Sequence, residues 1–228
     1  WTDSLVGLLS GVAVVVAIAR GAWQLMGIRQ RRRSVHARHI ELSWLLTGQS
    51  PRADSILWLP TTEPHAYSLV GNPPLVVMSV GLRDCLGQRA VNAVRSHENA
   101  HIQRRHHVYV AVAQALSASL GWLPLMRQSP GLVRTLIELD ADAHAARVHG
   151  SWPVRQAIQT LQHAAAPAVS LGIAGDCAQL RLARLTAHYP EAAQPRPRSG
   201  AADTTMMIAS IVAVAALLIA TGLVSCSH

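Results

Sequence analysis

The sequence predicts an α+β domain that is mostly helical, contains a small β-hairpin and is flanked by two transmembrane helices. Three observations support this fold class. Long apolar stretches lie near both ends of the 228 residues. Two short runs of β-forming residues lie on either side of a Gly-Asn-Pro-Pro turn. The segment that follows them has neither Gly nor Pro over residues 88–106, as an uninterrupted helix requires.

The two apolar stretches have the length of transmembrane helices. Residues 206–224 carry no charge, and 19 helical residues rise roughly 28 Å, about one hydrocarbon core. Residues 5–28 are interrupted only by Arg20, so we expect residues 1–28 to form the first span. Charged residues make up 14% of the chain, against about 25% in typical soluble domains. The low charge excludes a disordered chain and favours contact with a lipid bilayer.

A basic cluster follows the first apolar stretch, and it consists of Arg29, Arg31, Arg32, Arg33 and Arg38. Such a cluster beside a span marks the cytoplasmic side of a membrane. A nucleic-acid surface is the alternative. The adjacent span already accounts for the cluster, so we expect no direct nucleic-acid partner.

The remaining boundaries follow from these assignments. Residues 29–55 are predicted to be a basic juxtamembrane segment and 56–189 a folded domain, with a linker at 190–205, a second span at 206–224 and a tail at 225–228. If both spans cross the bilayer, residues 29–205 form one cytoplasmic module of a multi-pass membrane protein.

Residues 97–101 read His-Glu-Asn-Ala-His, the pattern H-E-x-x-H. Residues four apart share one face of a helix, so His97 and His101 can bind one metal ion. Zinc binds imidazole nitrogen, and Glu98 can reach a water molecule beside the metal as a general base. We therefore expect a zinc site with His97 and His101 as ligands and Glu98 as the catalytic residue. Two solvated histidines on a helix face are the alternative.

A second acidic motif lies downstream in a mainly apolar segment, and it contains Glu138, Asp140 and Asp142. Glu138 and Asp142 are four residues apart and project together from a helix. We expect Glu138 to be the third metal ligand, which leaves one coordination position open. Asp142 is expected to orient a ligand histidine through its second ring nitrogen. Asp140 is expected on the surface, and a solvated acidic face is the alternative for the whole motif.

Residues 108–126 form a third apolar stretch between the two motifs. If this stretch crossed the bilayer, His101 and Glu138 would lie roughly 30 Å apart, whereas zinc ligands lie within about 2.2 Å of the ion. We therefore predict a helix that enters or lies against the membrane without crossing and doubles back through 121–131. A core helix of the domain is the alternative. The next helix is predicted to start at Ser129-Pro130 and to end at Gly150.

The β-forming runs, residues 66–70 and 75–80, are predicted to form a hairpin around Gly71–Pro74. An edge strand near the H-E-x-x-H helix can hold an extended substrate by strand addition. A purely structural hairpin is an equally good interpretation of the sequence.

These motifs, in this order over residues 56–148, resemble the BlaR/MecR family of membrane zinc metallopeptidases. The resemblance is carried by His65–Ser68, Leu75–Leu82, His97–His101, Trp122–Pro124 and Glu138–Asp142. It implies a gluzincin domain with one Zn²⁺ per chain, anchored in a bacterial plasma membrane. It also implies a regulatory endopeptidase of signal transduction, whose substrate is a cytoplasmic repressor of the BlaI/MecI type. We expect no penicillin-binding sensor of the signalling members after the last span, so a different trigger or a separate sensory partner is expected.

Other interpretations of the resemblance stay open. The sequence is also similar to HtpX-type quality-control proteases, which share both zinc motifs, and a non-catalytic zinc-binding membrane subunit is a third possibility. Homodimers and association with other membrane proteins are both compatible with the sequence. Gluzincins stabilise the reaction's oxyanion with His or Tyr, and His149 is the candidate because it shares a helix face with Glu138.

Overall fold

The computed structural model describes residues 2–48, 56–165 and 173–189. Within these ranges the elements are α1 (Thr2–Thr47), β1 (Ile56–Leu59), β2 (Ala66–Leu69), β3 (Leu75–Ser79), α2 (Val80–Cys85), α3 (Gln88–Gln103), α4 (His106–Leu120), α5 (Pro124–His149), α6 (Ser151–Ala165) and α7 (Ile173–His188). Among the described residues, those from 16 to 189 form one compact unit, which holds every described element except the start of α1. The predicted linker, second span and tail lie outside the described residues.

A mixed three-stranded sheet has the order β1-β3-β2. The predicted hairpin is present: β2 and β3 pair antiparallel, with Tyr67 opposite Val77. Both strands end one residue earlier than predicted. β1 pairs parallel to the other edge of β3, with Ile56 opposite Val76, and was not predicted. All five residues of β3 are buried, which fits its place as the central strand, and β2 remains an edge strand of this sheet.

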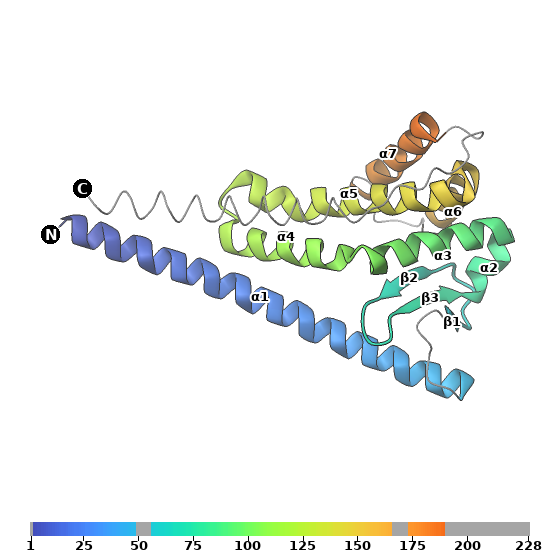
Figure 1. Ribbon diagram of the computed structural model, residues 1–228, viewed down its shortest axis with the longest axis horizontal. Helices are drawn as coiled ribbons and strands as arrows, with labels where there is room; N and C mark the ends of the chain where they lie inside the picture. Colours follow the sequence, from blue (N-terminus) through green and yellow to red (C-terminus); the bar gives the residue numbers. More distant parts are fainter. Residues whose placement is uncertain (1, 49–55, 166–172, 190–228) are drawn as a thin grey trace. The chain divides into compact units, whose positions relative to one another are not determined.

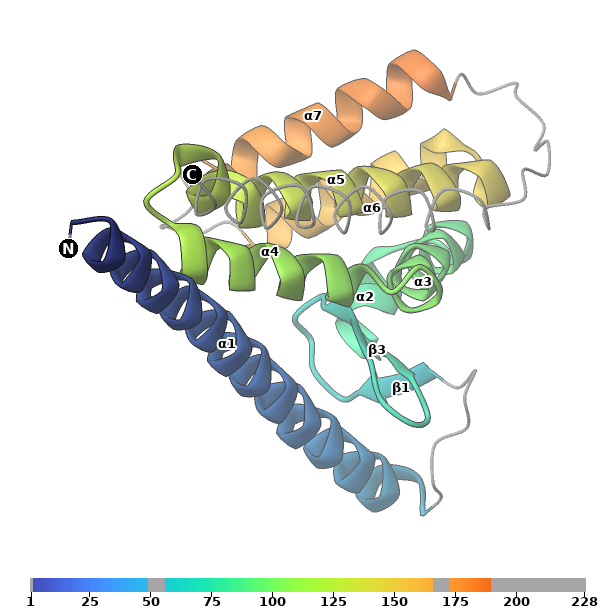
Figure 2. The ribbon, with the colours of Figure 1, turned by 60° about the vertical axis from the view of Figure 1, so that its left-hand side comes forward.

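Helix α3 lies between the sheet on one side and α5 and α6 on the other, as Figures 1 and 2 show. On the sheet side, Val76 and Met78 pack with Val91 and Val94 of α3 in one hydrophobic core. On the other side, alanines of α3 and α5 are fully or almost fully buried, among them Ala93 and Ala145. These small alanine side chains let the two helix backbones approach closely. The histidines of α3 and the carboxylates of α5 can therefore reach one another.

The predicted helix over residues 88–106 is interrupted. Helix α3 ends at Gln103, and α4 begins at His106 after a turn in which Arg105 has φ 52°, in the left-handed region. A residue with this φ cannot continue a right-handed helix. The break makes His106 the first residue of α4, and its side chain is buried.

The connection between α4 and α5 is shorter than predicted. The chain reverses at residues 121–123, and α5 packs along α4. The predicted start of this helix at Ser129-Pro130 is wrong, because α5 begins at Pro124 and contains Pro130. Pro130 has no N–H for the carbonyl of Met126, and the Ser129 hydroxyl donates to that carbonyl instead at 2.8 Å. The predicted end at Gly150 is confirmed, with φ 84°.

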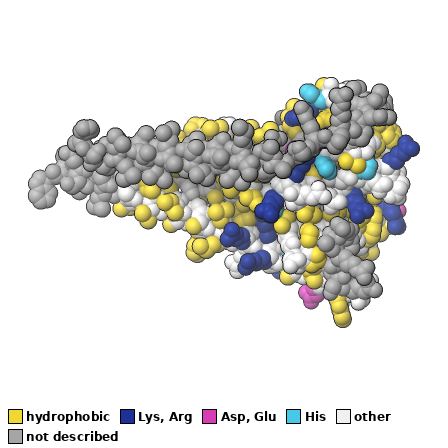
Figure 3. Space-filling view, in the orientation of Figure 1, with side chains coloured by type: hydrophobic (Ala, Val, Ile, Leu, Met, Phe, Trp, Pro, Cys, Tyr) yellow, Lys and Arg dark blue, Asp and Glu magenta, His cyan; other side chains and the backbone are white. Residues whose placement is uncertain are grey.

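Helix α1 is continuous through both the predicted first span and residues 29–47 of the juxtamembrane segment. Among the described residues it is the one helix long and apolar enough to cross a membrane, judged by length and composition over Ser10–Leu46. Side chains such as Ile18 and Trp23 are 66% and 80% exposed. Figure 3 shows basic side chains gathered on α1 beyond its hydrophobic stretch. The structure thus agrees with one membrane-associated helix whose basic segment is also helical.

Polar contacts join the second half of α1 to the rest of its unit. Arg32 donates to the carbonyl of His107 at 2.9 Å. The ring of His36 lies 2.8 Å from the carbonyl of Pro73 in the β2–β3 turn, and His39 lies 2.7 Å from the Tyr67 hydroxyl on β2. α1 therefore contacts the edge strand that faces the functional site described below.

Candidate metal centre

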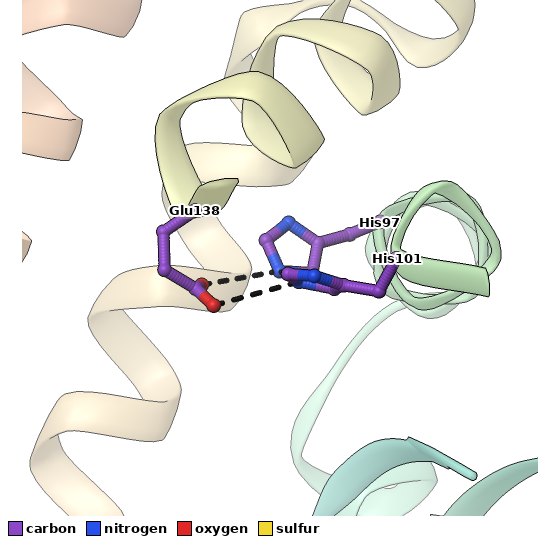
Figure 4. Close-up of side chains that lie close together, drawn as sticks. All are labelled: His97, His101 and Glu138. Atoms are coloured by element: carbon purple, nitrogen blue, oxygen red, sulfur yellow. Dashed lines mark hydrogen bonds and ion pairs between the residues drawn. The ribbon is translucent and has the colours of Figure 1, made fainter. Parts of the chain in front are cut away.

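Three side chains from two helices converge on one point. His97 and His101 project from α3, and Glu138 projects towards them from α5 (Figure 4). The two histidine Nε2 atoms lie 3.1 Å apart. Nε2 of His97 lies 3.3 Å from Oε2 of Glu138, and Nε2 of His101 lies 3.5 Å from Oε1. Within the described residues this is the group of donors whose atoms all lie close enough to hold one metal ion.

The spacings between these donor atoms fit a tetrahedral zinc ion. Bonds of 2.0–2.1 Å at tetrahedral angles place neighbouring ligand atoms roughly 3.3 Å apart. The two Nε2 atoms are 3.1 Å apart, and each lies 3.3–3.5 Å from one of the two carboxylate oxygens of Glu138, which is close to this value. The structure therefore brings together the three predicted ligands in a geometry that a small divalent cation fills.

Asp142 lies where the sequence prediction requires it. Its Oδ1 is 2.9 Å from Nδ1 of His97, and its side chain is 2% exposed. Arg181 of α7 binds the same carboxylate twice, through Nε at 2.6 Å and Nη2 at 2.8 Å. Its Nη1 also lies 3.1 Å from Oε2 of Glu138. The guanidinium group of Arg181 thus contacts both Glu138 and Asp142, the carboxylate that holds His97.

The second ligand histidine has a partner that the sequence did not reveal. Nδ1 of His106 lies 2.9 Å from Nδ1 of His101, and Nε2 of His106 lies 3.0 Å from Oδ2 of Asp140. Arg104 pairs with the other oxygen of Asp140. The pKa of Asp140 is lowered to about 2, because hydrogen bonds with His106 and Arg104 outweigh the effect of burial. Asp140 is therefore a partly exposed residue, 40% of its side chain being accessible, that also belongs to the chain of contacts around His101.

These contacts fix which ring nitrogen of each ligand histidine carries the proton. The Asp142 carboxylate can only accept, so Nδ1 of His97 donates to it. His106 donates to Asp140 through Nε2 and therefore accepts from Nδ1–H of His101. Both ligand histidines are left with lone pairs on Nε2, and these face each other at 3.1 Å. Two nitrogen lone pairs at this separation suit one cation that binds both.

The pKa values of these three side chains are strongly shifted. Burial lowers the pKa of His97, but hydrogen bonds with Asp142 and Glu138 outweigh it and raise the pKa to about 9. Burial and the charge on His97 lower the pKa of His101 to about 4. Burial raises the pKa of Glu138, but its hydrogen bond with His97 outweighs this, and the pKa falls to about 2. The two carboxylates around His97 therefore favour a positive charge at this position.

Glu98 lines the same pocket as His97, His101 and Glu138, but it does not belong to this group of possible metal ligands. Burial raises the pKa of its carboxyl group, although the charge on His97 and a hydrogen bond with Ser68 on β2 act in the opposite direction. A desolvated carboxylate with a raised pKa is a stronger base than one in water. The pocket has a volume of about 560 Å³ and is lined by residues of the edge strand β2 and of helices α1, α3, α4, α5, α6 and α7.

His149, the candidate oxyanion stabiliser, does not line this pocket. It lies at the end of α5, with its Nε2 2.7 Å from the Ser96 hydroxyl. Arg181 is a residue near the metal centre that sequence analysis missed, because it lies 39 residues from Asp142 with no motif around it.

The family comparison agrees with this centre. The family model for peptidase family M48 matches residues 30–199, which include all three ligands, Glu98, Asp142 and Arg181. A search of curated proteins found no significant match to the chain. The model covers most of the sequence, and the mostly helical fold with a small mixed sheet fits a metalloprotease domain. The chain therefore belongs to peptidase family M48, and its His–His–Glu group is that of a metal-dependent protease.

Proposed function

We propose that the protein is a zinc-dependent endopeptidase anchored in a bacterial plasma membrane, with its catalytic domain in the cytoplasm. One observation carries this proposal: His97, His101 and Glu138 direct their donor atoms at one point, and Glu98 lines the pocket that contains this point. Three protein ligands with one free position are the arrangement of catalytic rather than structural zinc sites.

The donor set supports zinc among the divalent cations. Two imidazole nitrogens and one carboxylate oxygen at tetrahedral spacing suit zinc, whereas calcium and magnesium prefer all-oxygen sites with more ligands. A zinc ion held by these side chains supplies a Lewis acid that polarises a peptide carbonyl and acidifies water.

The chain's own residues account for the proton transfers of peptide hydrolysis. Glu98 is placed to accept a proton from the attacking water and to pass it to the amine that leaves when the C–N bond breaks. Asp142 and His106 hold the two ligand imidazoles so that their Nε2 lone pairs stay directed into the pocket. Arg181 keeps Asp142 and Glu138 ionised by offsetting their buried negative charge.

The edge strand supports an extended peptide as substrate. Tyr67 and Ser68 of β2 line the pocket, and β2 pairs within this sheet only with β3. The outer backbone groups of such a strand can bind a peptide by strand addition. This arrangement favours cleavage within a chain, and the substrate proposed from the BlaR/MecR resemblance is a cytoplasmic repressor of the BlaI/MecI type.

The decisive experiment replaces Glu98 by Gln in the full-length protein. We expect hydrolysis of a casein or peptide substrate to fall by more than about a hundredfold, while bound zinc stays near one per chain. Glu63→Gln is the matched control, because Glu63 is an exposed carboxylate outside the pocket. Loss of zinc together with activity, or unchanged activity, would contradict the assigned role of Glu98. Zinc content near zero in the purified wild type would overturn the proposal.

A second experiment tests the regulatory role. In cells that express the protein with a BlaI/MecI-type repressor, we expect the repressor's half-life to shorten with the wild type and not with E98Q. A stable repressor together with accelerated loss of damaged membrane proteins would instead support the quality-control alternative. No difference between wild type and E98Q in either measurement would favour a non-catalytic subunit.

A further inference from the structure

The pocket that holds the metal centre also has a strongly basic part. Arg32 of α1, His107 of α4 and Arg134 of α5 line the same pocket as the three metal ligands. We call these three residues the arginine end. Arg134 precedes Glu138 by four residues on α5, so their Cβ atoms lie about 5–6 Å apart on one face of the helix. The arginine end therefore lies about one helical turn from the metal centre.

The charge of the arginine end is not offset inside the pocket. The carboxylates that line the pocket are Glu98, Glu138 and Asp142, all at the metal centre. Glu138 and Asp142 are already paired with Arg181. Among the described residues, no carboxylate lies within ion-pair distance of Arg32 or Arg134. Two arginine charges thus remain available to a ligand that enters the pocket.

Arg32 is held in position without being neutralised. Its guanidinium donates to the main-chain carbonyl of His107 at 2.9 Å, which fixes the side chain and leaves its other N–H groups for a ligand. This contact also connects α1 to the first turn of α4, so the arginine end is assembled from elements far apart in the sequence.

His107 provides an independent indication of a ligand. Its Nδ1 is buried and has no hydrogen-bond partner among the described residues. A buried polar atom without a partner costs about 1–3 kcal/mol. Burial, Arg32 and Arg105 lower the pKa of this imidazole, so the ring is neutral and can donate one hydrogen bond to an incoming acceptor.

We infer that the arginine end is a subsite for an acidic side chain of the peptide substrate. This inference rests on the proposed function, since it places a substrate carboxylate beside the peptide bond that is cut. The carboxylate accepts hydrogen bonds from Arg32 and Arg134 and from Nδ1–H of His107, while Val110 and Ile137 contact its methylene stem. An anionic lipid headgroup shares this chemistry, but the three residues line the catalytic pocket, which favours the substrate.

The test uses peptides that differ at one position. The full-length zinc-loaded protein in detergent is given a peptide series with Glu, Gln or Lys placed in turn at each residue around the cleaved bond. We expect one position at which kcat/KM for Glu exceeds that for Gln by about tenfold. Arg134→Gln and Arg32→Gln should each reduce this ratio towards one, and Arg134→Glu should favour the Lys peptide. Arg127→Gln, an exposed arginine of α5 outside the pocket, should keep the ratio.

Binding separates this inference from the proposed function. Anisotropy of labelled Glu and Gln peptides is measured on zinc-loaded E98Q and on metal-free protein, with and without R134Q. A preference for Glu that R134Q removes supports the subsite even if the protein hydrolyses no peptide, an outcome that would overturn only the proposed function. If wild type binds the Glu and Gln peptides equally well, the subsite is overturned. The same holds if the preference for Glu persists in both R134Q and R32Q. If R134Q loses binding to phosphatidylglycerol vesicles but keeps the wild-type preference for the Glu peptide, the substrate subsite is also overturned, and a lipid site is favoured.

Discussion

Nδ1 of His106 lies 2.9 Å from Nδ1 of His101, so the second ligand histidine is held by another histidine. The first ligand, His97, is held by a carboxylate, that of Asp142. In both cases the outer residue accepts a hydrogen bond from Nδ1–H of the ligand histidine, and Nε2 stays free for the metal. The two arrangements differ in chemistry: a carboxylate lies beside His97, whereas a second imidazole lies beside His101.

His106→Ala is expected to weaken zinc binding by about 10- to 100-fold, because His101 would lose the acceptor that fixes its ring orientation and tautomer. Zinc affinity is measured by competition with a chromophoric chelator, and the visible spectrum of the cobalt-substituted protein reports the ligand geometry. His188→Ala is the control, because His188 is an exposed histidine at the end of α7. Equal zinc affinity in wild type and H106A would show that the His106 contact does not position His101.

The parts of the site that depend on local helix geometry were predictable from the sequence. His97 and His101, like Glu138 and Asp142, are four residues apart, and the 3.6-residue repeat of a helix puts each pair on one face. The hairpin around Gly71–Pro74 was equally local, since turn chemistry and alternating β-formers lie next to each other.

The parts that depend on tertiary packing were not predictable in this way. Arg181 reaches Asp142 only because α6 and α7 fold back along α5, and nothing in the spacing of α7 indicates this contact. The error at Ser129-Pro130 has a related cause. A serine before a proline favours a helix start, but here the Ser129 hydroxyl compensates for the missing N–H within a longer helix. The contact between His106 and His101 likewise depends on the break at Arg105, which an uninterrupted helix over residues 88–106 does not contain.

Zinc affinity is expected to rise about tenfold per pH unit and to level off near pH 9. Zinc needs the unprotonated His97, and a raised pKa means that the proton competes with the metal at every pH below that value. In Asp142→Asn, the hydrogen bond that raises the pKa of His97 is weakened, so the plateau should begin at lower pH. The measurement is competitive chelator titration from pH 6 to about 10.

Asp140→Asn serves as the control for this pH profile, because Asp140 belongs to the chain of contacts that holds His101 rather than His97. In this variant, zinc affinity is expected to level off at the same pH as in wild type, even if the affinity itself changes. If zinc affinity levels off at the same pH in D142N as in wild type, the proton that competes with zinc is not the one on His97.

Two glycine-to-alanine changes are expected to shift stability in opposite directions. Gly81 is buried in the first turn of α2, and a Cβ there would lie 1.9 Å from the carbonyl oxygen of Thr62, a main-chain atom that cannot move aside alone. Gly81→Ala should therefore lower the free energy of unfolding by about 3 kcal/mol. Gly131 is exposed within α5 with no atom near its Cβ position, so Gly131→Ala should raise it by about 0.5–1 kcal/mol. Urea titration of the protein in detergent measures both, and a stable G81A would show that residues 61–62 do not pack against α2 as described.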